Sequence, residues 1–265
     1  MASDISMKTA TAERAPLTQR VIDHFVARIH ASPVEREPFM NSYFTGAFPD
    51  DVYAEIRRRM PARDRYLPLN LKRWKNAEGQ STRDKLCLSA GEIDRIAPED
   101  RQFWSELTDA LTSRELQQAV YFSMRDDVSL RLGCSPEEVV GREPFTNVLL
   151  VRDFADYRLK PHPDGQPRVV TMMIYLADEG SPTDLGTSLY RERPLLDRLL
   201  GKRFEEVARF PFLPNSVGTF VVNDRPDRRS WHGRELIEGQ TVVRDSIIVS
   251  FMSEEGHDNG MKHNY

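Results

Sequence analysis

The sequence has little cysteine, no excess of basic residues and no long apolar run. Cys87 and Cys134 are the only cysteines among 265 residues and form no C-x-x-C pair, so we expect reduced thiols in a cytoplasmic protein. A net charge of −4 argues against a general nucleic-acid surface. No apolar stretch approaches the roughly 20 residues of a membrane span, and residues 1–16 lack the apolar segment of a secretory signal. We therefore expect neither a nucleic-acid nor a membrane partner.

The composition is that of an ordinary globular protein, with 39% hydrophobic and 29% charged residues. We expect a flexible tail over residues 1–16, one domain over 17–252 and a polar tail over 253–265, whose His257 and His263 are not expected to bind metal. Within the domain, helices at 17–140 would support a β core at 144–252. The sequence leaves the oligomeric state open between monomer and homodimer.

Two kinds of hydrophobic spacing divide the domain. Apolar residues recur at helical spacing in three stretches of the first half, namely 17–30, 98–113 and 115–132. A fourth helix, which Asp50 or Asp51 can cap, is expected to run to Met60. From Pro144 onward the pattern changes to short β-like runs between turn residues, at 146–151, 157–161, 169–176, 217–222 and 241–252. A short helix and linker are expected at 194–204. Several short strands separated by turn signals favour a sandwich or barrel.

The most informative stretch is the His162-Pro163-Asp164 tripeptide. Residues two apart in an extended chain point to the same side, so an imidazole and a carboxylate could meet at one ion. His232, on a later segment, would complete a 2-His-1-carboxylate triad, which is typical of non-haem Fe(II) oxygenases. The alternatives are a plain Pro-Asp-Gly turn after His162 and a loop histidine at position 232.

Two predicted strands carry polar residues beside this triad. Thr171 and Tyr175 share one face of the run 168–176, and Arg244 and Ser246 share one face of the run 244–251. An arginine that points into a sheet needs an anionic partner, because a buried charge is unstable unless it is paired. A carboxylate fits a guanidinium fork together with a hydroxyl group. We therefore expect Arg244 and Ser246 to bind a carboxylate.

This order of motifs resembles the Fe(II)/2-oxoglutarate-dependent oxygenases. His-x-Asp, a later His and an Arg-x-Ser match their pattern, and the run R-x-x-T-x-x-x-Y-L at 168–176 is similar to the prolyl-hydroxylase-like branch. Gly186-Thr187 stands where that branch has a small-residue turn. The resemblance covers about residues 147–252. Leu159 departs from it, since the branch usually has a tyrosine three residues before the first metal histidine.

The resemblance implies a double-stranded β-helix, or cupin-like jelly roll, that is mainly β with N-terminal helices. It implies Fe(II) at His162, Asp164 and His232, with O2 as cosubstrate. It also implies 2-oxoglutarate at four residues, Arg244, Ser246, Tyr175 and Thr171. The reaction would hydroxylate an unactivated C–H bond and release succinate and CO2. Asp164 favours hydroxylation over halogenation, because related halogenases have Gly or Ala at this position.

The substrate is the least defined part of this interpretation. Candidate contacts are Arg168, Tyr190, Arg225 and Arg234, and Arg228 and Arg229 also crowd around His232. They suggest a small polar metabolite that is amino-acid-like or anionic, although a charged surface loop and a prolyl substrate stay open. The alternative function is a metal-binding cupin-type isomerase or binding protein without O2 chemistry. A third alternative is a jelly-roll interaction module without metal, but it would leave His162, Asp164 and His232 without a common function.

Overall fold

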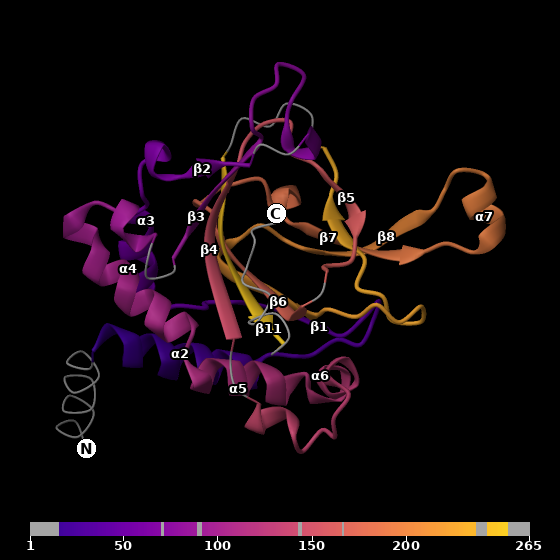
Figure 1. Ribbon diagram of the computed structural model, residues 1–265, viewed down its shortest axis with the longest axis horizontal. Coiled ribbons are helices and arrows are strands. Elements are labelled where there is room, and N and C mark those ends of the chain that lie inside the picture. The colour runs from indigo at the N-terminus through magenta and orange to yellow at the C-terminus, as the bar shows by residue number, and fades with distance from the viewer. Residues whose placement is uncertain are drawn as a thin grey trace.

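The computed structural model describes residues 16–69, 72–88, 92–142, 145–165, 167–236 and 243–253. Most of the two expected tails, including His257 and His263, and the first residues of the strand expected at 241–252 lie outside these ranges. In the described part of the chain, two antiparallel sheets face each other, and helices cover the outer side of the larger sheet (Figure 1). This is the expected jelly roll.

The larger sheet has seven strands. In spatial order they are β1 (Asn41–Thr45), β9 (Pro214–Val221), β6 (Arg168–Leu176), β11 (Arg244–Met252), β4 (Phe145–Asp153), β3 (Arg83–Cys87) and β2 (Leu67–Pro68). The smaller sheet has four, in the order β5 (Leu159–His162), β10 (His232–Arg234), β7 (Thr187–Glu192) and β8 (Phe204–Phe210). Every strand pair is antiparallel.

The α-helices are α2 (Leu17–Ala31), α3 (Asp50–Arg58), α4 (Pro98–Leu111), α5 (Arg114–Ser123), α6 (Arg125–Leu132) and α7 (Leu195–Leu199). Single 3-10 turns occupy η1 (Arg63–Arg65), η2 (Lys72–Trp74), η3 (Ile93–Arg95), η4 (Val139–Gly141) and η5 (Thr183–Leu185). The helix expected over 115–132 is two helices, because Met124 between them leaves the helical region with φ −114° and ψ 21°.

The first half of the chain contributes strands as well as helices. β1 pairs with β9, and β3 pairs with β4, so both belong to the larger sheet. Residues 17–140 therefore contribute strands to the larger sheet in addition to the helices that we expected there. These strands have five residues each, which is too short for a clear alternating pattern, and their pairing partners lie far away in the sequence.

Alternation along the central strands separates two cores. On β6, Met172 and Ile174 face the helices, where they join a cluster that includes Phe25 of α2. Met173 and Tyr175 face the smaller sheet and join an aromatic cluster between the sheets. The same alternation on β11 turns Arg244, Ser246 and Ser250 toward the space between the sheets. Polar side chains therefore face the space between the two sheets, next to the apolar cluster that fills part of it.

The hairpin of β7 and β8 extends away from the body and ends in α7 (Figure 1). At the base of this hairpin, Gly186 touches the end of β8. A Cβ atom there would lie 1.8 Å from the carbonyl oxygen of Phe210, so only glycine fits. This contact fixes the small sheet at the position where Thr187 enters the interior.

Candidate active site

The three expected metal ligands converge at one end of the smaller sheet. His162 is the last residue of β5 and pairs directly with His232, the first residue of β10. The ligand atoms offered by these histidines and by Asp164 all lie within 4.8 Å of one another. Each Nε2 atom is 3.8 Å from Oδ1 of Asp164. The separation is compatible with ligands roughly 2 Å from one ion, as we expected from the sequence.

Backbone carbonyls fix the orientation of both imidazole rings. Nδ1 of His162 lies 3.0 Å from the carbonyl oxygen of Lys160, and Nδ1 of His232 lies 2.9 Å from that of Ser230. A carbonyl oxygen can only accept a hydrogen bond, so each Nδ1 carries the proton. The lone pairs of the two Nε2 atoms are therefore available to a metal ion, as in other histidine metal sites.

The carboxylate ligand is held by two side chains of β6. Arg168 donates through Nη1 to Oδ1 of Asp164 at 2.6 Å, and the hydroxyl of Thr171 donates to Oδ2 at 2.6 Å. Arg168, expected at the substrate rim, thus contacts an expected metal ligand. Thr171 also contacts that ligand, and its expected cosubstrate contact stays a prediction. Together the two donors fix the rotamer of Asp164.

The protonation states suit a divalent cation. Burial lowers the pKa of His162 to about 4, and the neighbouring His232 contributes to this shift. Burial also lowers the pKa of His232. Burial alone would raise the pKa of Asp164, but Arg168 and both histidines outweigh it and hold this pKa well below its usual range. Neutral imidazoles and an ionised carboxylate are the forms that bind metal.

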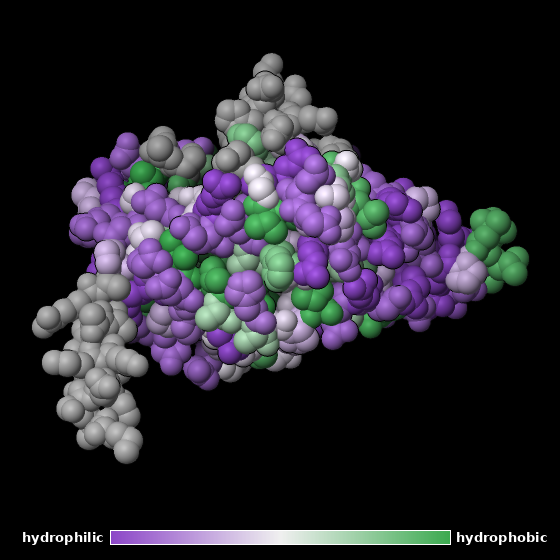
Figure 2. All heavy atoms as spheres, turned by 90° about the horizontal axis from the view of Figure 1, so that it is seen from below, coloured by the Kyte–Doolittle hydropathy of each residue, from purple (hydrophilic) through white to green (hydrophobic). Residues whose placement is uncertain are grey.

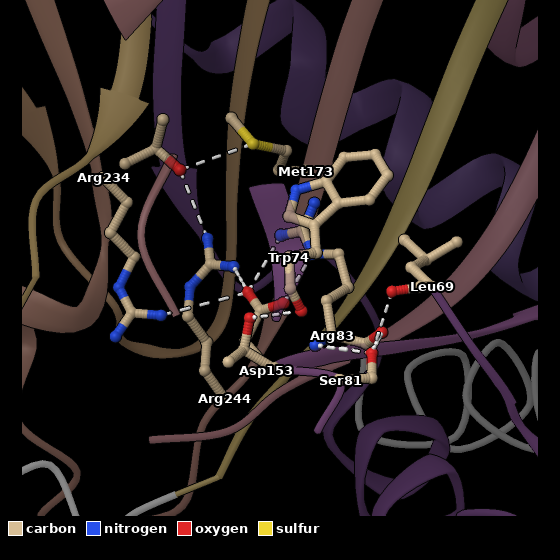
Figure 3. A network of polar contacts seen from close by, with 10 residues as sticks. Leu69, Trp74, Ser81, Arg83, Asp153, Met173, Arg234 and Arg244 are labelled. Atoms are coloured by element: carbon tan, nitrogen blue, oxygen red, sulfur yellow. Dashed lines mark hydrogen bonds and ion pairs between the residues drawn. The ribbon is translucent and has the colours of Figure 1, made fainter. Parts of the chain in front are cut away.

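A second polar cluster lies between the sheets around Arg244, which is only 3% exposed (Figure 3). Its Nη1 donates to Oδ2 of Asp153 at 2.7 Å, and its Nη2 donates to the hydroxyl of Thr187 at 3.2 Å. The hydroxyl of Tyr175 donates to the same Thr187 oxygen at 2.7 Å. Tyr175 and Arg244 thus share one neighbour, and their expected contact with 2-oxoglutarate stays a prediction.

Two buried donors of this cluster have no partner among the described residues. They are Nε of Arg244 and the hydroxyl of Ser246. An unsatisfied buried donor costs free energy, and in a native structure it calls for an explanation such as an absent ligand. A carboxylate beside these atoms would satisfy both donors. The residues therefore fit the distal carboxylate of 2-oxoglutarate, and the triad fits the ion that its other end would chelate.

Sequence reasoning missed three residues of this cluster: Arg83, Asp153 and Thr187. Arg83 binds the Asp153 carboxylate with Nε at 2.5 Å from Oδ1 and Nη2 at 2.9 Å from Oδ2. Burial alone would raise the pKa of Asp153, but the surrounding arginines, Arg83 first, keep it below its usual value. The one available signal was Gly186-Thr187, which the family resemblance marked as a turn without a side-chain role.

The other expected substrate contacts do not gather at the triad. The hydroxyl of Tyr190 lies 3.2 Å from Oε1 of Glu235. Arg225 is exposed. Arg234 is buried at 4% exposure and reaches the cluster around Asp153, where burial and then Arg244 lower its pKa to about 10. Of the basic residues expected as substrate contacts close to His232 in the sequence, Arg234 is thus the one that enters the interior.

No family model matches the sequence, and no curated protein does. Solved structures match over most of the chain. The non-haem alpha-ketoglutarate-dependent epimerase SnoN from nogalamycin biosynthesis is 12% identical, with 88% of this chain and 82% of that one covered at a TM-score of 0.48. A prolyl-4-hydroxylase of Pseudomonas putida is 13% identical, with 88% and 100% covered at 0.48. HygX of Streptomyces hygroscopicus, solved with nickel and 2-oxoglutarate, is 13% identical, with 81% and 83% covered at 0.45. These are similarities of fold alone, at low sequence identity.

Proposed function

We propose that this protein is an Fe(II)- and 2-oxoglutarate-dependent dioxygenase. It would hydroxylate an unactivated C–H bond of a small polar metabolite, amino-acid-like or anionic, with release of succinate and CO2. The observation that carries the proposal is the convergence of His162, Asp164 and His232 within 4.8 Å of one another. The unpartnered donors of Arg244 and Ser246 support the other part of the proposal, a binding site for the carboxylate of the cosubstrate.

The residues of the chain have separate tasks in this reaction. His162 and His232 present Nε2 to the ion because backbone carbonyls hold their Nδ1–H groups. Arg168 and Thr171 keep Asp164 ionised and oriented. Arg244 holds the far end of the cosubstrate, which fixes the near end at the metal. Fe(II) with bound 2-oxoglutarate supplies, in the presence of O2, an oxidant able to attack an unactivated C–H bond.

Among the described residues, no helix is both long and apolar enough to cross a bilayer. Neither Cys87 nor Cys134 forms a disulfide in the described part of the chain, which suits the reducing cytoplasm where we place the reaction. The expected partner is a small molecule.

The first test is metal binding by purified, metal-free protein. Wild type should bind one Fe(II) or Mn(II), and His162→Ala, Asp164→Ala and His232→Ala should each weaken this binding strongly. His30→Ala is the matched control, since His30 is an exposed helix residue. Equal metal affinity in the three triad variants and in the control would exclude the triad.

The second test is release of succinate from 2-oxoglutarate by the Fe(II) form across a panel of metabolites. Succinate release should be faster with a substrate than without one, and Asp164→Ala should abolish succinate release. Metal binding without 2-oxoglutarate binding or turnover would instead support the cupin-type isomerase or binding protein.

A further inference from the structure

The helix α6 lies on the outer side of the larger sheet, against β6 and β9, and buries a charged side chain. Figure 2 shows this side of the molecule, where hydrophilic residues surround a smaller hydrophobic area. Leu130 of α6 is 47% exposed, whereas Asp127 is only 1% exposed. An aspartate is almost never fully buried unless it is paired. The burial of Asp127 therefore calls for a specific partner.

The partner of Asp127 is Arg228, in the loop between β9 and β10. Nη1 of Arg228 donates to Oδ1 of Asp127 at 2.6 Å. Arg228 crowds around His232 in the sequence, but its side chain reaches α6 instead. Among the described residues, this is the only ion pair that joins residues 224–229 to another element. The loop is thus fastened to α6 at one point.

This loop ends at the expected metal ligand His232, so its path decides where that imidazole lies. The backbone amide of Ser230 donates to the carbonyl oxygen of Asn223 at 3.0 Å, and the amide of Asn223 donates to the hydroxyl of Ser230 at 3.1 Å. The carbonyl oxygen of Ser230 in turn accepts from Nδ1 of His232 at 2.9 Å. A displacement of the loop would therefore turn the imidazole of His232 as well.

The same face of α6 also contacts the other arm of the site. Arg131 lies four residues after Asp127 and hence on the same face of the helix. Its Nε and Nη2 donate to the carbonyl oxygen of Arg168 at 3.1 and 2.8 Å. Arg168 is the first residue of β6, and its side chain donates to the carboxylate of Asp164 at 2.6 Å. One face of α6 is therefore linked to the chain before His232 and to the chain after Asp164.

We propose that α6 positions the metal site, with Asp127 as the positioning residue for His232. Asp127 acts through Arg228 and does not touch the ion, while Arg131 fixes the start of β6. The two contacts would keep His232 and Asp164 at a fixed separation before an ion binds, which lowers the cost of assembling the site around the ion. This inference rests on the proposed function.

The first test is calorimetric titration of Mn(II) into metal-free protein, well below the unfolding temperature. Asp127→Asn keeps the shape of the side chain and removes its charge, so it should weaken Mn(II) binding about 3- to 10-fold. This effect is smaller than the roughly 10- to 100-fold expected for a group that contacts a metal ligand directly. Asp126→Asn is the matched control, because the neighbouring Asp126 pairs with Arg36 at the surface and its loss should leave the Mn(II) affinity unchanged.

Two further variants separate positioning from a general loss of stability. Ile56→Val makes a small cavity at a fully buried residue of α3 and should lower the melting temperature without weakening Mn(II) binding. Arg228→Met removes the other partner of the Asp127 contact. Because both changes break the same contact, Arg228→Met should add nothing to the effect of Asp127→Asn on Mn(II) affinity.

Amide hydrogen exchange of the metal-free protein is a second readout, which needs no ion. The amides of Asn223 and Ser230 should exchange about 5- to 10-fold faster in Asp127→Asn than in wild type. The reason is the loss of a charge-assisted hydrogen bond to Arg228, which is 43% exposed. Exchange of these two amides at the wild-type rate would overturn the inference.

The two tests distinguish a failure of this inference from a failure of the proposed function. If wild type binds Mn(II) and Asp127→Asn binds it with an affinity within about twofold of wild type, α6 does not position the site and the proposed function stands. If wild type does not bind Mn(II), the proposed function is overturned, and the role of α6 in positioning a metal site is overturned with it.

Discussion

Asp153→Asn should destabilise the protein far more than the loss of an ordinary ion pair. Asp153 is fully buried, and it accepts from Arg83 at 2.5 and 2.9 Å and from Arg244 at 2.7 Å. Removing one partner of a buried ion pair leaves an uncompensated charge and costs about 3–5 kcal/mol. At about 2–4 °C per kcal/mol for a domain of this size, the melting temperature should fall by roughly 6–20 °C.

Urea unfolding and calorimetry measure the two quantities. Asp126→Asn is the matched control, because Asp126 also pairs with an arginine at 2.7 Å but does so at the surface, where the partners are 68% and 47% exposed. That change should cost less than about 1 kcal/mol. If the two variants lose the same free energy of unfolding, Asp153 does not compensate a buried charge and the reasoning on the arginine cluster fails.

The same variant has a defined pH dependence. The pKa of Asp153 is lower in the folded protein than its usual value, so its contribution to stability is present above the unfolded pKa of about 3.9. The contribution is lost as the pH falls further, toward the folded pKa. The difference in free energy of unfolding between wild type and Asp153→Asn should therefore be constant above about pH 5 and shrink below about pH 4.

Three other substitutions test single contacts. Arg244→Lys keeps the charge but loses the planar fork of the guanidinium. The dissociation constant of 2-oxoglutarate, measured in the O2-free Mn(II) form, should therefore rise roughly 10- to 150-fold, while the affinity for Mn(II) stays unchanged. If wild type and variant bind 2-oxoglutarate equally well, Arg244 is a structural ion-pair residue. Thr171→Val removes the 2.6 Å hydrogen bond to the carboxylate of Asp164, the expected metal ligand, and should weaken Mn(II) binding roughly 10- to 100-fold in a direct titration. Unchanged Mn(II) binding would show that this hydrogen bond does not orient Asp164. Gly186→Ala would place Cβ 1.8 Å from the carbonyl oxygen of Phe210 and should cost about 1–3 kcal/mol in urea unfolding. Gly141→Ala, with open space around it, is its control, and equal losses would contradict the close contact.

The grouping of His162 with Asp164 could be predicted from the sequence because its signals are local. His162 and Asp164 are two residues apart, and the strand that follows supplies Arg168 and Thr171 at a spacing fixed by the alternation of a β-strand. The same alternation correctly turned Arg244 and Ser246 inward. What the sequence did not show is that Arg168 contacts Asp164. That contact depends on the path of the chain between β5 and β6.

The arginine cluster could not be predicted because it depends on pairing between distant strands. Arg83 and Arg244 both face Asp153, since β3 and β11 flank β4 in register. Neither neighbour of β4 is adjacent to it in the chain, so no local pattern places these residues together. Arg234 was expected as a substrate contact at the loop. The three-residue strand β10 carries it into the interior instead.

The two histidines of the expected metal site belong to one layer of the sandwich, and Arg244 with Tyr175 belongs to the other. A cosubstrate held at both ends would act as a mechanical tie between the layers. Moving the small sheet away from the large one would then require the contacts with the ligand to break. Opening of β5 and β10 would therefore be coupled to ligand release. At a ligand concentration 100 times its dissociation constant, this tie adds about 2.7 kcal/mol to the cost of opening. Amide protons of β5 and β10 would exchange correspondingly more slowly, and the sandwich would be most rigid when it is loaded for turnover.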